Sequence, residues 1–255
     1  MPVLAEAQSP QIRDAGDYIF RIQPDSRYYL KYLVPYVFET LKIKKLAILY
    51  VNNDYGSDQA SFFAESFKKL GGEVIFYDGF SQNSTDFKTQ LTKLKALKPE
   101  GVFIPAYTEA GYILKQSHEM GFSPQFIGSA PMENPEIITI AGIAANGVVY
   151  PHHFDPETNN RTAKTFIYNY DMKYNSKPEG YSALAYDGLF VIKAMIEQCG
   201  EDRECIKNNL YKINYSGVTG ATSFDNHGDV VKPITIRHIV NQEFRTILTY
   251  DLLTN

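Results

Sequence analysis

The polar residues of this 255-residue chain form few arrangements that could carry out chemistry. Asp54, Asp86 and Asp187 are candidate acids, but no base or nucleophile stands beside any of them. The adjacent His152 and His153 do not suit one metal ion, because neighbouring residues of a strand point to opposite faces. The sequence also has no glycine-rich phosphate loop, dinucleotide fingerprint or nucleophile elbow. We therefore predict a protein that is not an enzyme and that uses no cofactor or metal.

Two cysteines, Cys199 and Cys205, flank a Gly-Glu-Asp-Arg turn between two helical patterns. A short separation around a turn allows the Cα spacing that a disulfide requires. Zinc needs more ligands than these two cysteines supply, and the His residues are not near them. We favour a disulfide over two free thiols, which indicates an oxidising compartment.

Composition excludes several classes of partner. The formal net charge is -4, and the basic residues are spread along the chain, so nucleic acid is not an expected partner. The apolar runs are too short or too interrupted to span a bilayer of ~30 Å, so membrane insertion is not expected. Met1 is followed at once by Pro-Val-Leu-Ala-Glu, which does not resemble a secretory signal. The 19 Tyr and 16 Phe suit both internal packing and recognition surfaces.

Strand-like and helix-like stretches alternate through the first part of the chain. The run 46–51 is apolar without alternation, which is typical of a strand buried on both faces. This alternation predicts an α/β fold with doubly wound parallel sheets and right-handed crossovers. The predicted strands are 46–51, 73–80, 101–106, 125–128 and 147–154, and the predicted helices are 29–41 with an interruption at Pro35, 58–70, 86–97, 110–120 and 135–141.

Beyond residue 154 the pattern changes to three helices, at 159–174, 181–198 and 203–211, followed by two or three strands with glycine-rich turns. We expect one complete α/β lobe at 24–150 and a second, partial lobe. The partial lobe takes residues 1–23, with the first crossing between the lobes, and residues 151–238. Residues 239–255 are expected to form a terminal strand segment that returns to the complete lobe.

Polar and aromatic residues follow three of the predicted strands. Asp54 and Tyr55 come after the first strand, Tyr107 after the third, and Ser129 and Ala130 after the fourth. Ligands of open parallel sheets bind at the carboxyl ends of strands. These residues are therefore expected to lie together at one edge of the sheet, on the wall of a binding cleft.

Several segments carry a resemblance to a known family. They are "NNDYGSD", "GVFIPAYTEA", "QFIG", "IAGIAANGVV", "KPEGYSALAYDGLFVIKAMIEQCG" and "GVTGATSFDNHGD". Together they resemble the type I periplasmic binding proteins of ABC importers, in the branch of leucine/isoleucine/valine-binding proteins. The resemblance covers nearly the whole chain and implies a two-lobed fold. Family members begin with further strands of the first lobe, so the resemblance also implies an amino-terminally truncated first lobe.

The resemblance assigns roles to single residues. Tyr55 and Tyr107 match positions whose rings line one wall of the cleft. Gln8 and Ser9 match the loop that holds a ligand carboxylate, although a hydroxyl residue is usual where Gln8 stands. Tyr181, and Asp187 on the same helix, are expected to face the cleft from the other lobe.

Ala130 stands where amino-acid binders of this family place an acidic residue against the ligand ammonium. Burying an ammonium without a counter-charge is costly, so this departure argues against a plain aliphatic amino acid. Glu133 and Asp54 are the residues that would have to replace the missing charge.

The resemblance implies binding without covalent chemistry. A small solute, an amino acid or related carboxylate and possibly an aromatic one, would favour a closed state that an ABC permease recognises. The crossings between the lobes are expected at 22–24, 150–152 and 225–229. The implied location is periplasmic or extracellular, and a homodimer that covers the apolar edges of the incomplete lobe is a further expectation.

Three alternatives stay open at this point. The same fold serves as the ligand-sensing domain of a receptor or regulator, and a transmembrane or kinase segment elsewhere in the gene would favour that function. An α/β enzyme with a nucleotide substrate is the second alternative, and the missing phosphate loops argue against it. The third is that a chain with half of its pocket absent binds nothing.

Overall fold

The computed structural model describes residues 2–251, which divide into two compact units. Unit 1 takes in the described parts of Met1–Asp25, His153–Thr235 and Thr249–Asn255, and unit 2 consists of Ser26–His152 and Ile236–Leu248. The architecture is α/β, with helices packed on sheets as the sequence predicts. Within residues 2–251, no helix is both long enough and apolar enough to cross a membrane.

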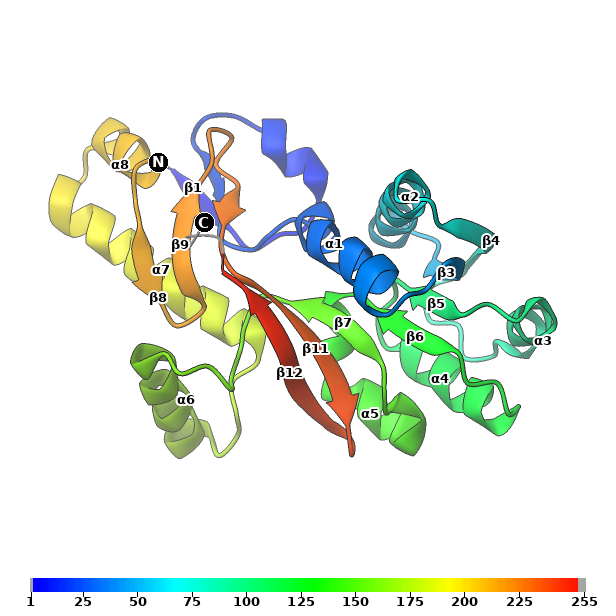
Figure 1. The fold of residues 1–255 in the computed structure, drawn as a ribbon. Coiled ribbons are helices and arrows are strands. Elements are labelled where there is room, and N and C mark those ends of the chain that lie inside the picture. Colours follow the sequence, from blue (N-terminus) through cyan, green and yellow to red (C-terminus); the bar gives the residue numbers. More distant parts are fainter. Residues whose placement is uncertain (1, 252–255) are drawn as a thin grey trace. The chain divides into compact units, whose positions relative to one another are not determined.

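Unit 2 is built on a seven-stranded sheet with the strand order β12-β11-β7-β6-β5-β3-β4 (Figure 1). Pairing is parallel between β4 and β3, β3 and β5, β5 and β6, and β6 and β7. The strands are β3 (Lys45–Val51), β4 (Glu73–Phe80), β5 (Gly101–Ile104), β6 (Gln125–Gly128), β7 (Val149–His152), β11 (Ile234–Val240) and β12 (Glu243–Tyr250).

The strand order reverses between β3 and β5. The chain goes from β3 outward to β4, then returns to the other side of β3 for β5, β6 and β7. In open α/β sheets such a reversal separates the loops that leave the two neighbouring strands and opens a crevice at their carboxyl ends. The topology of unit 2 therefore singles out the segments after β3 and β5.

Helices cover both faces of this sheet, α1 and α2 on one face and α3, α4 and α5 on the other (Figure 1). The α-helices are α1 (Ser26–Pro35), α2 (Asp54–Lys69), α3 (Lys88–Leu97), α4 (Glu109–Glu119) and α5 (Pro135–Ala141). A π-helix (Tyr36–Thr40) follows α1, and 3-10 helices precede and follow α5 at Ala130–Glu133 and Gly142–Ala145.

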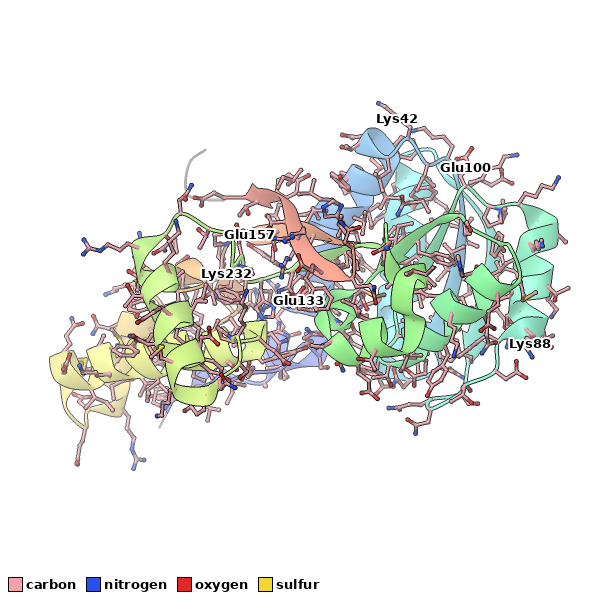
Figure 2. All side chains as sticks on the ribbon, turned by 90° about the horizontal axis from the view of Figure 1, so that it is seen from below. Lys42, Lys88, Glu100, Glu133, Glu157 and Lys232 are labelled. Atoms are coloured by element: carbon pink, nitrogen blue, oxygen red, sulfur yellow. A yellow bond between two sulfur atoms is a disulfide. The ribbon has the colours of Figure 1, made fainter. Side chains whose placement is uncertain are left out.

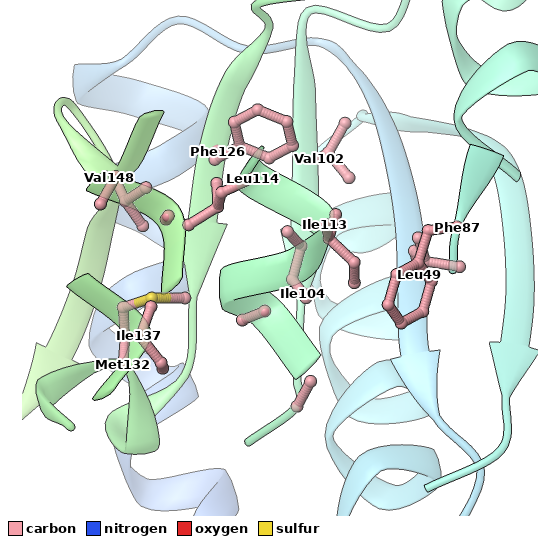
Figure 3. Packing of buried hydrophobic residues seen from close by; sticks show 14 of the residues in the cluster. Leu49, Phe87, Val102, Ile104, Ile113, Leu114, Phe126, Met132, Ile137 and Val148 are labelled. Atoms are coloured by element: carbon pink, nitrogen blue, oxygen red, sulfur yellow. The ribbon is translucent and has the colours of Figure 1, made fainter. Parts of the chain in front are cut away.

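The core of unit 2 explains why its central strands, such as β3 and β5, are continuously apolar. Leu49 and Ile104 belong to the cluster that α3, α4 and α5 cover, where they lie with Phe87 and Ile113 (Figure 3). On the opposite face, Phe63 of α2 stacks on Phe103 of β5 with ring centroids 4.2 Å apart. The central strands β3 and β5 are therefore buried on both faces, as expected for parallel strands, whereas the edge strands β4 and β12 are partly exposed.

Several element boundaries in unit 2 differ from the prediction. Helix α2 begins at Asp54 and not at 58, so the Asp-Tyr-Gly segment is helical. Helix α1 begins at Ser26, and Pro35 is its last residue before the π-helix, so Pro35 ends the α-helix and does not merely interrupt it. Strand β5 ends at Ile104 because Pro105, which has no backbone N–H, follows it.

Unit 1 contains a two-stranded parallel sheet, a three-stranded sheet and three α-helices. Its core has two clusters, one around Phe20, Leu184 and Val191 and one around Phe154 and Ala183. The elements are β1 (Val3–Ala5), a 3-10 helix (Pro10–Asp14), β2 (Ile19–Arg21), α6 (Arg161–Tyr174), α7 (Gly180–Cys199), α8 (Arg203–Leu210), β8 (Tyr215–Gly217), β9 (Gly220–Phe224) and β10 (Val230–Val231).

A disulfide joins Cys199, the last residue of α7, to Cys205 in α8, with a Cα–Cα distance of 5.6 Å. Asp202 caps the start of α8 by accepting hydrogen bonds from the backbone N–H groups of Glu204 and Cys205. The cap and the disulfide together fix the turn between the two helices.

The carboxyl-terminal third differs most from the prediction. Five strands, β8 to β12, occupy the region where two or three were expected. The expected crossing at 225–229 is wrong, because this segment is the β9–β10 turn inside unit 1, where Asp225 accepts hydrogen bonds from His227 and Asp229. The chain instead passes from one unit to the other between Thr235 and Ile236, within β11.

Candidate functional site

Tyr55 is the second residue of α2, and two neighbours fix its position. The side-chain oxygen of Asn53 caps the helix by accepting a hydrogen bond from the Gly56 N–H at 2.9 Å. A Cβ on Gly56 would lie 2.0 Å from the carbonyl oxygen of Val51, so only glycine lets the first helical turn pack against the end of β3. The sequence Asn-Asp-Tyr-Gly thus turns a buried strand directly into a helix and presents Tyr55 at the turn.

Tyr107 lies between β5 and α4, where the buried carboxylate of Glu109 holds the loop. Glu109 accepts hydrogen bonds from the backbone N–H groups of Tyr107, at 3.1 Å, and of Asn83, at 2.7 Å. Its side chain is buried, with 2% of the residue exposed. The carboxylate therefore ties the segment after β5 to the segment after β4.

The rings of Tyr55 and Tyr107 stack on each other. Their centroids are 5.2 Å apart and their planes are inclined by 22°. The Tyr55 hydroxyl donates a hydrogen bond to Oγ of the buried Ser129, directly after β6, at 3.1 Å. Stacked aromatic pairs of this kind stabilise by about 0.5–1.5 kcal/mol beyond their burial. We call Tyr55, Tyr107 and Ser129 the tyrosine shelf.

The tyrosine shelf is uncharged at neutral pH. Burial raises the pKa of the Tyr107 phenol above its usual value, and the negative charge of Glu109 acts in the same direction. Hydrogen bonding to Asn53 opposes the shift only in part. The shelf therefore offers aromatic faces and hydroxyl groups, which suit binding by contact and hydrogen bonds.

Other predicted residues near the tyrosine shelf differ in their burial and in their partners. Asp54 is exposed in the first turn of α2, where a negative charge interacts favourably with the helix dipole. Ala130 is buried next to Ser129. Glu133, labelled in Figure 2, pairs with Arg237 and accepts a hydrogen bond from the Tyr150 hydroxyl. Of the two residues that would have to replace the missing charge, Glu133 thus already has a cationic partner.

Gln8, Ser9 and Tyr181 belong to unit 1. Gln8 is half-buried, and Ser9 is exposed, with its carbonyl oxygen accepting a hydrogen bond from Arg21 at 2.6 Å. Tyr181 is the second residue of α7, is 42% exposed, and has its ring 5.8 Å from that of His153. These three residues are thus not part of the tyrosine shelf on unit 2.

Asp187 is fully buried in unit 1 and serves as an acceptor. Its carboxylate accepts hydrogen bonds from the N–H groups of Val218 and Thr219, at 2.7 and 2.8 Å, and from the Thr219 hydroxyl at 2.5 Å. The buried Lys232 (Figure 2) donates to the same hydroxyl at 2.5 Å. Asp187 therefore anchors the β8–β9 turn. This is a structural role, whereas the sequence had made Asp187 a candidate acid and a candidate cleft residue.

Unit 1 also has a polar cavity of about 480 Å³. Its lining includes the carboxylates of Asp155, Glu157 and Asp251 and the hydroxyl of Thr219. A small solute fits this cavity by volume, so binding tests need variants that separate it from the tyrosine shelf. Within residues 2–251, no group of three or more His, Cys, Asp or Glu side chains is arranged to hold a metal ion.

Three residues that support the site were missed from the sequence. Asn53 was not predicted to cap a helix, although Asn three residues before Gly at the end of a buried strand is a capping signal. Glu109 in "YTEA" has no such signal, because its partner Asn83 comes from another loop. Arg237 is 104 residues from Glu133 along the chain, so their pairing had no local signal.

The parallel sheet with aromatic residues at its strand reversal, accompanied by a second unit of helices and sheets, defines an α/β protein with a two-lobed fold. A family model described as periplasmic binding protein matches residues 2–243. The chain therefore belongs to the periplasmic binding protein family. Within that family it is of type I and falls in the leucine/isoleucine/valine-binding branch.

Relatives and solved structures agree on this branch. Leu/Ile/Val-binding protein homolog 3 of Brucella melitensis is 28% identical over 236 residues, which is 91% of this chain and 64% of the relative. A leucine binding protein of Thermotoga maritima has a TM-score of 0.91 at 25% identity, over 100% of this chain and 74% of that one. A branched-chain amino acid transporter substrate binding protein of Streptococcus pneumoniae, in complex with isoleucine, has a TM-score of 0.88 at 28% identity, over 99% and 72%.

The chain spans only part of the length of its curated relatives. The share is 64% for the Brucella melitensis protein and 52% for a Leu/Ile/Val/Thr/Ala-binding protein of Pseudomonas aeruginosa that is 30% identical over 200 residues, or 76% of this chain. The similarity therefore covers a part of each of these relatives and not its whole length.

Proposed function

We propose that this chain is the solute-binding component of an ABC importer. It acts in the periplasm or outside the cell, where it binds a small solute and delivers it to a membrane permease. The solute is an amino acid or a related carboxylate, and aromatic carboxylates are included. The single observation that carries the binding role is the tyrosine shelf at the strand reversal of unit 2. The structure of the Streptococcus pneumoniae relative in complex with isoleucine supports the choice of solute class.

The proposed binding relies on contacts between the solute and the tyrosine shelf and involves no chemical reaction. The two rings stack on each other, and the Tyr55 ring is also held by the Ser129 hydrogen bond at the start of a capped helix. Because these rings are ordered in the folded protein, a solute that contacts them loses less free energy to side-chain ordering on binding. Solute contact with such a surface gains free energy from buried apolar area, and the hydroxyls select orientation. A ligand that prefers one conformation of the protein shifts its population, which is the signal that a permease needs.

A thermal-shift screen tests this function. The purified chain is heated with amino acids, aromatic acids and small carboxylates, and a solute that binds only the folded state raises the melting temperature by mass action. We expect one chemical class to raise it by several degrees at a hundredfold excess over Kd, because the stabilisation is about 2.7 kcal/mol there. No shift with any solute, on a chain that melts cooperatively, would contradict the proposal.

Variants locate the binding. Tyr55→Ala and Tyr107→Ala are expected to remove the shift, whereas Tyr77→Ala is expected to retain it. Tyr77 is the matched control, because it is a tyrosine of unit 2 that is 45% exposed on edge strand β4 and packs on Tyr50. A shift that survives both shelf variants would assign binding to another site, such as the polar cavity of unit 1.

A further inference from the structure

The structure bears on the charge of the solute group that meets the tyrosine shelf, and this inference rests on the proposed function. An amino acid at neutral pH carries an ammonium group next to its carboxylate. Taking an ammonium out of water costs several kcal/mol unless a carboxylate or other acceptors replace its hydration. The carboxylates that follow β3, β5 and β6 therefore decide which solutes this surface accepts.

Glu109, after β5, is engaged by the backbone. Its two oxygens accept hydrogen bonds from the N–H groups of Asn83 and Tyr107, and the residue is 2% exposed. Turning the carboxylate toward a ligand would leave both of these N–H groups without their acceptor and would release the Tyr107 loop. Glu109 therefore holds the tyrosine shelf in place and does not serve as a ligand group.

Glu133, after β6, already has a cation. One oxygen pairs with the Arg237 guanidinium and the other accepts a hydrogen bond from Tyr150. Arg237 is 1% exposed and also donates to the Phe244 carbonyl at 3.1 Å, so it is held in place from two sides. A ligand ammonium near Glu133 would meet a neutral ion pair whose positive member cannot move away.

The remaining groups beside the tyrosine shelf offer little to an ammonium. Ala130, next to Ser129, is buried and apolar. Asp54, after β3, is exposed, and its charge is balanced by the amino-terminal end of α2 and by water. Asp58, further along α2, is paired with Arg27. Unlike Asp58, Asp54 has no cationic side-chain partner among the described residues, and it lies on the exposed side of the helix start.

We propose that the tyrosine shelf takes carboxylate solutes that lack an α-ammonium group, with an aromatic or branched apolar group against the stacked rings. The solute is then a simple or 2-oxo carboxylic acid and not a zwitterionic amino acid. The uncharged phenols and the buried Ala130 match an apolar group, and every buried carboxylate nearby is already satisfied.

Matched pairs of solutes test this inference on the purified chain. The pairs are 3-phenylpropionate with L-phenylalanine and 4-methylpentanoate with L-leucine, which differ only by the α-ammonium. Isothermal titration calorimetry and thermal shift are used on the same samples. We expect the deaminated member of at least one pair to bind at least tenfold more tightly than its amino acid.

The outcomes separate this inference from the proposed function. Equal or tighter binding of the amino acids overturns the inference and leaves the solute-binding function standing. Binding by no member of either pair, together with no shift in the wider screen, overturns both. Retained amino-acid binding that is lost in Asp54→Asn would identify Asp54 as the counter-charge and would also overturn the inference.

A charge-restoring variant gives an independent readout. Ala130→Glu places a carboxylate beside Ser129 and is expected to reduce the preference for the deaminated acid at least tenfold. Ala130→Gln adds a side chain of similar size without a charge. It is therefore expected to weaken the binding of both members of a pair equally. An equal change of preference in both variants would mean that size and not charge sets the selectivity, which contradicts the proposal. If Ala130→Glu does not fold, the wild-type comparison still decides.

Discussion

The buried Lys232 of unit 1 should make the stability of the chain depend on pH. Burial lowers the pKa of Lys232 from its ordinary value of 10.5 to about 8, although the charges of Asp187 and Glu6 act in the opposite direction. The ammonium donates to the Thr219 hydroxyl, and the residue is 1% exposed. The folded state therefore releases this proton more readily than the unfolded chain does.

The sign and the size follow from proton linkage. Below pH 8 both states hold the proton, and the cost of the buried charge is fully present. Between about pH 8 and 10.5 the unfolded state binds more protons than the folded state, so the free energy of unfolding rises with pH. The slope approaches about 1.4 kcal/mol per pH unit, and the whole shift corresponds to roughly 3 kcal/mol.

The assay is urea unfolding followed by circular dichroism from pH 7 to 9.5, on the wild type and on Lys232→Met. The wild-type stability minus that of the variant is expected to increase by roughly 2 kcal/mol over this range. Taking the difference cancels the tyrosines and other groups that titrate in both proteins. Lys212→Met, which removes an exposed lysine of the same unit, is the matched control. A difference that stays flat across the range would refute the account, as would an equal slope in the control.

Two further predictions concern the elements around the site and the helix turn. Gly56→Ala is expected to destabilise the chain by about 1–3 kcal/mol in urea unfolding, because its Cβ would meet the Val51 carbonyl at 2.0 Å, whereas Gly188→Ala in α7, with contacts at 3.5 Å or more, should be neutral or stabilising. Equal effects of the two substitutions would contradict the close-approach argument. Replacing both Cys199 and Cys205 by Ser is expected to cost about 2 kcal/mol, and a thiol reductant should lower the melting temperature of the wild type but not of the double variant.

The sequence allowed most of unit 2 to be predicted, because its elements are specified locally. Strand β4 (Glu73–Phe80) and helix α5 (Pro135–Ala141) have the predicted bounds, and β3 differs by one residue. Each is a periodic or continuously apolar run with a turn or cap at its ends. Helix α2 was placed four residues late because the cap depends on Asn53 and on the contact of Gly56 with Val51, which a helical period does not reveal.

The strands after α8 were harder to predict for a physical reason. Strand β12 alternates exposed and half-buried positions and β11 is almost wholly buried, so the two share no burial pattern, and turns in this part of the chain depend on non-local partners. The β9–β10 turn is one example, because Asp229 in it also binds Arg21, which is 208 residues away along the chain. A pairing of this length has no signature in a window of sequence.

At the candidate site, the positions of the residues were predictable from the sequence, but the partners of its charged groups were not. The tyrosines and Ser129 were located from the sequence because each follows a strand, and parallel strands bring their carboxyl ends to one edge. Whether a carboxylate there is available to a ligand depends on its partners, and those partners are remote. Arg237 reaches Glu133 from β11, and Asn83 reaches Glu109 from the loop after β4.

Because the partners of these carboxylates are remote in sequence, the class of ligand is harder to predict from the sequence than the fold. Under the proposed function, the strand reversal sets where a solute meets unit 2, because it brings the rings of Tyr55 and Tyr107 together from the ends of two strands. Selection between an amino acid and its deaminated counterpart depends on one buried charge and on whether a cation from another strand already neutralises it. Under the proposed function, the Arg237–Glu133 pair is therefore one contact on which the choice of solute depends, whereas the tyrosine shelf forms from contacts that do not include this pair.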